Sequence, residues 1–198
     1  MADNRIPNWA RCLAVVWLAI WIPCYWTFWG FTNFIHLCDL AILLSCIGLW
    51  TSSGLLLSSQ AASSLLIDSV WTADALWRAF TRHHLIGGTE YLFDAKYPVW
   101  IRAFSLFHLL LPLVLLLALR RTGYHRRGWL LQCGIAAVAV PLSRLAGPVN
   151  NYNFAFRDPV WHRALGPTPI HLATIFAALM AMYGLTHLAL KKFLPAPR

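Results

Sequence analysis

A histidine, a thiol and a carboxylate lie within four consecutive residues at the start of an apolar segment. They are His36, Cys38 and Asp39, and a further histidine, His108, lies in another apolar segment. A thiol attacks an ester carbonyl effectively when a nearby histidine accepts its proton, and a helix N-terminus favours the thiolate. These residues therefore predict nucleophilic acyl chemistry if the fold brings Cys38 and His108 together. The alternative is that Cys38 is an ordinary buried thiol.

Further polar residues interrupt the apolar segments or flank them. We assign the catalytic role to Cys38 and His108, with Asp39 or Asp68 holding the imidazole, and Asn151 or Asn153 polarising the carbonyl. The residues expected to contact substrate are His36, Arg144, Asn151, Asn153 and His171. For Asp39, pairing with Arg144 and a simple helix-start position remain alternatives, and for the asparagines, turn formation. The histidines show no metal-binding spacing, so neither a metal nor another cofactor is expected.

The composition is that of a membrane protein. Of the 198 residues, 59% are hydrophobic and only 12% are charged, which is too apolar for a soluble domain of this size. The net charge of +9 comes from short basic clusters beside apolar segments, a pattern that argues against nucleic-acid binding. The five cysteines are scattered and form no C-x-x-C pair, which excludes a dithiol centre.

Six segments are long enough to cross a bilayer, which takes roughly 20 apolar residues. The sequence predicts a single all-α transmembrane domain over residues 1–198, in which the first segment is a span and not a cleaved signal peptide. The third segment is the least apolar and requires its serines, Gln60 and Asp68 to face neighbouring helices. The predicted spans are 10–29, 32–50, 54–77, 99–119, 128–146 and 168–190.

The charges outside these spans predict an orientation. One side collects nine basic residues against the single acid Asp3, whereas the other mixes basic and acidic residues. The basic side should be cytoplasmic, with both termini, and short loops suit a bacterial inner membrane. The polar residues of the spans then converge on the outer half, beneath the loop that contains Asn151 and Asn153. The basic side comprises Arg5, Arg11, Arg120, Arg121, Arg126, Arg127, Lys191, Lys192 and Arg198.

The motif His36-Leu37-Cys38-Asp39-Leu40, together with His108 and the Asn151-Tyr152-Asn153 stretch, resembles the YwaF-like integral membrane family. That family includes a transmembrane cysteine acyltransferase and is remotely similar to the androgen-induced-gene (ADTRP-type) lipid hydrolases. The resemblance implies that Cys38 matches the family's nucleophile and His108 its catalytic histidine. It covers about residues 31–190.

These observations favour a membrane lipid acyltransferase or lipid-ester hydrolase that acts on membrane lipids, and they predict no particular oligomeric state. A small transporter or binding protein with an Asp/Arg/His pathway is the main alternative. A membrane scaffold without chemistry, in which the polar stripe joins helices, is another.

Overall fold

The described part of the chain is all-α. A computed structural model describes residues 6–196, in which seven α-helices and four short 3-10 helices are present and no strand. Three charges counted above, on Asp3, Arg5 and Arg198, lie outside the described residues. The α-helices are α1 (Asn8–Trp29), α2 (Leu37–Thr51), α3 (Gly54–Thr81), α4 (Val99–Phe104), α5 (Phe107–Thr122), α6 (Gly128–Leu142) and α7 (Thr168–Phe193); the 3-10 helices are η1 (Phe31–Ile35), η2 (Glu90–Leu92), η3 (Ser143–Ala146) and η4 (Tyr152–Phe154).

Four stretches among residues 6–196 are long and apolar enough to cross a membrane, which indicates a membrane protein. They are Asn8–Trp29, Val99–Thr122, Gly128–Ala146 and Thr168–Phe193. The other two expected spans are helical but do not meet this description. Helix α2 is apolar but has 15 residues, and α3 has 28 residues of which many are polar.

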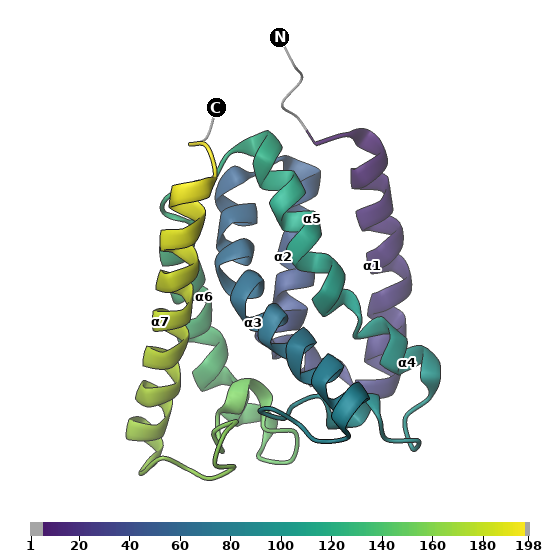
Figure 1. Cartoon of the computed structure of the whole chain (residues 1–198), viewed down its shortest axis with the longest axis vertical. Helices are drawn as coiled ribbons and strands as arrows, with labels where there is room; N and C mark the ends of the chain where they lie inside the picture. Colours follow the sequence, from purple (N-terminus) through teal and green to yellow (C-terminus); the bar gives the residue numbers. More distant parts are fainter. Residues whose placement is uncertain (1–5, 197–198) are drawn as a thin grey trace.

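The long helices run up and down in one bundle, and α3 crosses its middle obliquely (Figure 1). The beginning of α1 and the end of α7 lie at one end, which we call the terminal end. Segments 82–98 and 147–167 lie at the opposite end, which we call the loop end. Both ends of the described chain therefore lie on one side of the bundle.

Helix α3 is the polar centre of an apolar bundle. It packs against α2, α5, α6 and α7, and its face of serines, Gln60 and Asp68 is buried. Large apolar side chains such as Leu113, Val138 and Leu188 are exposed instead. Polar side chains inside and apolar ones outside are the arrangement that a lipid environment requires. The expectation that neighbours bury the polar stripe of the third segment is confirmed except at Ser69, which is exposed and donates its hydroxyl to the carbonyl of Leu65.

The fourth expected span is interrupted. Helix α4 ends at Phe104 and α5 begins at Phe107. Ser105 lies in the interruption, where its hydroxyl is 3.1 Å from the hydroxyl of Tyr25 in α1. As a result His108, expected about nine residues inside a continuous helix, is the second residue of a new one.

Candidate functional site

Polar side chains from distant segments meet in the loop-end half of the bundle, and we call them the polar cluster. Hydrogen bonds join Tyr25 to Ser105 and the amide of Asn33 to Oδ2 of Asp39, at 3.1 and 2.6 Å. The remaining members lie on elements that surround these pairs: α3 packs against both α2 and α5, and the ring of His108 in α5 lies against Trp71 of α3. The polar cluster comprises Tyr25 of α1, Asn33 of η1, His36, Cys38 and Asp39 at the start of α2, Asp68 of α3, Tyr91 of η2, Ser105, and His108 of α5.

Cys38 is the second residue of α2 and is partly buried. Asp39 follows it in the same helical turn, and Asp68 lies on α3, which packs against α2. The first backbone N–H groups of α2 have no partners within the helix and lie around Cys38. Carboxylates beside a thiol disfavour a resting thiolate, whereas N–H donors at a helix N-terminus stabilise negative charge. The surroundings therefore suit a thiol that loses its proton during reaction.

His108 lies between two aromatic rings. Its ring centroid is 4.3 Å from that of Trp71 and 4.0 Å from that of Phe107. Its Nδ1 is buried and has no hydrogen-bond partner in the described part of the chain. Within residues 6–196, no hydrogen bond joins the ring to Cys38 or to either carboxylate. The structure thus places His108 near the thiol-bearing segment without the expected Asp–His contact.

The two carboxylates of the polar cluster are both 2% exposed. Asp39 accepts a hydrogen bond from Asn33, and not from Arg144, which had been considered as a partner. Oδ2 of Asp68 is buried and finds no hydrogen-bond partner among the described residues. Buried carboxylates without a cation are costly in a membrane and are a mark of functional sites.

Segment 147–167 covers the loop end and joins the polar cluster through η4. Tyr152 packs its ring edge-on against His36, with centroids 4.8 Å apart. Oδ1 of Asn153 accepts the N–H of Leu37, and its Nδ2 donates to the carbonyl of Ile35. The expected contact between this asparagine-rich loop and the Cys38 motif is present, but the Asn153 amide binds backbone and has no free group for a carbonyl.

Three other predicted substrate contacts hold this loop together instead. Arg144 donates to the carbonyl of Ala155 and stacks on Phe156. His171 is 1% exposed and bridges two loop backbone groups, those of Phe154 and Leu165. Among the described residues, the side chain of Asn151 bonds only to backbone groups of residues 156 and 157.

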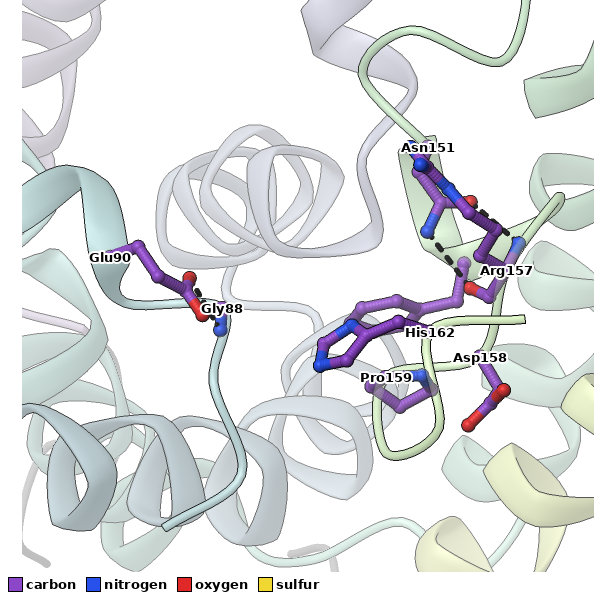
Figure 2. Close-up of a pocket in the computed structure, with 8 residues that line it drawn as sticks. Gly88, Glu90, Asn151, Arg157, Asp158, Pro159 and His162 are labelled. Carbon is purple, nitrogen blue, oxygen red and sulfur yellow. Dashed lines mark hydrogen bonds between the residues drawn. The ribbon is translucent and has the colours of Figure 1, made fainter. Parts of the chain in front are cut away.

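A cavity of about 410 Å³ opens between the two loop-end segments. Figure 2 shows Gly88 and Glu90 on one side, and Asn151, Arg157, Pro159 and His162 on the other. Asn151 and His162 have positive φ angles of 47° and 55°, a conformation that non-glycine residues adopt at a cost and that gathers at functional sites. Glu90 of η2 lines the cavity, and the next residue, Tyr91, has its ring 6.2 Å from that of Trp29 at the end of α1, measured between centroids.

Sequence reasoning missed four members of the polar cluster, Tyr25, Asn33, Tyr91 and Ser105. Tyr25 belongs to an aromatic run that is typical of lipid-facing surface, and its partner Ser105 is 80 positions away. Asn33 alone carried a usable signal, since it is a polar residue at the start of a predicted span, six positions before Asp39.

Comparisons of the chain with protein-family models, with curated proteins and with solved structures found no match. The YwaF-like resemblance of the His36–Asp39 motif, His108 and the Asn151–Asn153 stretch therefore stays a prediction. The functional argument depends on the geometry of the polar cluster.

Proposed function

We propose that the protein is a membrane-embedded acyltransferase or ester hydrolase that uses Cys38 as its nucleophile and glycerolipid esters as its substrates. The observation that carries the proposal is the polar cluster itself. It collects a thiol, a histidine and two carboxylates inside an apolar perimeter, and both Cys38 and His108 lie in the first turn of a helix. An acyl chain enters from the lipid, and the polar part of the substrate faces the loop-end cavity.

In the proposed reaction the sulfur of Cys38 attacks the ester carbonyl while His108 takes the thiol proton. Since the carboxylates disfavour a resting thiolate, proton loss accompanies S–C bond formation. The N–H groups at the start of α2 stabilise the oxyanion. Cleavage of the ester C–O bond releases an alcohol that receives the proton from His108. A second hydroxyl, from a lipid or water, then attacks the thioester, and its proton returns through His108 to sulfur.

This chemistry requires Cys38 and His108 to approach one another when substrate binds, because catalytic hydrogen bonds are often long without substrate. Oδ2 of Asp68 has no hydrogen-bond partner among the described residues, and we assign Asp68 the support of the imidazolium. Asn153, expected to polarise the carbonyl, has no such role here because its amide is occupied by the backbone groups of Ile35 and Leu37 and by the hydroxyl of Ser143.

The proposal is tested by lipid turnover of the purified protein with isotopically labelled glycerolipids. Cys38→Ser and His108→Ala should each lower turnover by about 100-fold or more, since nucleophile and base contribute at least this much. Cys46→Ser is the matched control, because Cys46 is also a partly buried cysteine of α2, and it should keep the parent rate. Full turnover by a folded Cys38→Ser variant would exclude a thiol mechanism.

A proton or cation pathway is a second candidate, favoured by the buried, unpartnered Oδ2 of Asp68. It predicts a different pattern, since transport would survive Cys38→Ser and be abolished by a further variant, Asp68→Asn. An ion-flux measurement in vesicles separates the two functions.

We further propose that α2 and α3 complete a six-span topology, with both termini in the cytoplasm of a bacterial cell. The packing of α3 against four neighbours supports a span whose polar face never meets lipid. The polar cluster then lies in the outer half of the inner membrane.

A further inference from the structure

Helix α2 begins without a side-chain cap of its own. His36 occupies the residue before the helix, and no hydrogen bond from its side chain reaches the first turn. Backbone N–H groups at a helix start need acceptors, and asparagine is among the best of them. The acceptor for Leu37 N–H is Oδ1 of Asn153, at 2.8 Å and 116 positions further along the chain.

The side chain of Asn153 forms hydrogen bonds with the backbone on both sides of His36. Its Nδ2 donates to the carbonyl of Ile35 at 2.8 Å, one residue before His36, while its Oδ1 binds one residue after it. The same Nδ2 donates to Oγ of Ser143 at 2.9 Å, and Ser143 in turn donates to the carbonyl of Ala139 in α6. Asn153 is 6% exposed. It therefore ties the start of α2 to the end of α6.

Cys38 is the residue after Leu37, so its sulfur lies in the same first turn and experiences the partial positive charge of the helix start. If the turn frayed, its aligned N–H donors and the partial positive charge of the helix start would be lost at the sulfur. The position of the thiol relative to its stabilising donors is thus set by a side chain that does not touch it.

We infer that Asn153 is a positioning residue for Cys38, which fixes the first turn of α2 and thereby the reactivity of the thiol. The catalytic meaning of this inference rests on the proposed function. The thiol reactivity itself does not, so it can be measured whether or not lipid is turned over.

The experiment measures the pH dependence of iodoacetamide labelling at Cys38 by mass spectrometry in the whole detergent-solubilised protein, with Cys46 as internal reference. The variant is Asn153→Gly, because position 153 has a φ of 51° that glycine adopts freely. Loss of the cap should move the labelling midpoint of Cys38 up by about 0.5 pH unit and leave that of Cys46 in place. The pH midpoint of labelling reports the ionisation of the thiol. The labelling rate at a single pH would also change with the accessibility of the sulfur.

Asn151→Gly is the matched control. Asn151 also has a positive φ, of 47°, in the same loop, but its hydrogen bonds all stay within that loop. It should leave the Cys38 midpoint unchanged. Equal shifts in both variants, or none in Asn153→Gly, would overturn the inference. If Asn153→Gly does not assemble, Ser143→Ala decides, since it removes one support of Asn153 and should move the midpoint in the same direction. Loss of turnover in Cys38→Ser is a separate result and bears only on the proposed function.

Discussion

Asp39, Asp68 and Asp158 are all buried carboxylates of the loop-end half, yet their surroundings differ in kind. Asp158 accepts three backbone N–H groups, from Val160, Trp161 and Arg163. Asp39 accepts one side-chain amide, and Oδ2 of Asp68 has no partner among residues 6–196. A carboxylate saturated by its own loop shapes that loop, whereas an unsatisfied one inside the bundle is available for chemistry.

Protonation of Asp158 should loosen segment 158–163. Desolvation raises the pKa of Asp158, but the three N–H groups outweigh it and hold the pKa below its ordinary value of 3.8. The stabilisation is therefore present above pH 3.8 and is lost as the pH falls through the lowered pKa. Hydrogen exchange at Val160 and Trp161, corrected for the intrinsic rate, should show this loss of protection.

Asp158→Asn is the control for this titration, because its amide oxygen still accepts N–H groups but does not titrate. Its exchange protection should not change across the same acidic range. If hydrogen-exchange protection fell by the same amount in the parent and in Asp158→Asn, the loosening would come from groups other than Asp158.

At the scale of helices, the beginning of α6 presses directly on the polar face of α3. A Cβ atom added at Gly128 would lie 2.5 Å from Cβ of Ser58 and 2.8 Å from its backbone carbon. The N–H of His125, just before α6, donates to Oγ of Ser58 at 2.8 Å. Backbone atoms cannot turn aside as a flexible side chain can, so only glycine permits this approach.

Gly128→Ala should therefore destabilise the bundle by about 1–3 kcal/mol, the usual effect of overpacking. Gly134 is the matched control, because it lies in the same helix and an added Cβ would meet nothing within 4 Å. Thermal unfolding in one detergent should show a lower midpoint for Gly128→Ala and little change for Gly134→Ala. Equal midpoints would show that α3 and α6 separate without cost.

Helix positions were predictable because length and hydropathy are local properties. The expected span 128–146 coincides with α6 and η3 together, and the polar face of α3 could be recognised as buried before its neighbours were known. The interruption after α4 could not be predicted, since neither glycine nor proline lies at residues 105–106. The hydroxyl of Ser105 is hydrogen-bonded to Tyr25 in another helix, which the local sequence does not show. Likewise, Asn153 was expected to bind substrate because nothing local shows that its partners are Ile35 and Leu37.

At the scale of the whole molecule, polarity is arranged along two directions. Across the bundle it falls from the buried face of α3 to an exposed apolar perimeter. Along the bundle, the polar cluster and the acidic residues Asp94 and Asp158 lie toward the loop end. At the terminal end the described charged residues are basic. The terminal-end set within the described residues comprises Arg11, Arg120, Arg121, Arg126, Arg127, Lys191 and Lys192.

This asymmetry predicts how the protein lies in a membrane, because Lys and Arg of short loops are retained on the cytoplasmic side. Lys96 lies in the loop-end segment and Lys192 in the last turn of α7, so Lys96→Cys and Lys192→Cys form a matched pair. A membrane-impermeant thiol reagent added to intact bacterial cells should label Lys96→Cys about tenfold more than Lys192→Cys, and permeabilisation should equalise them. Preferential labelling of Lys192→Cys in intact cells would invert the topology and place Cys38 and His108 in the cytoplasmic half, where the proposed reaction would draw on the inner leaflet.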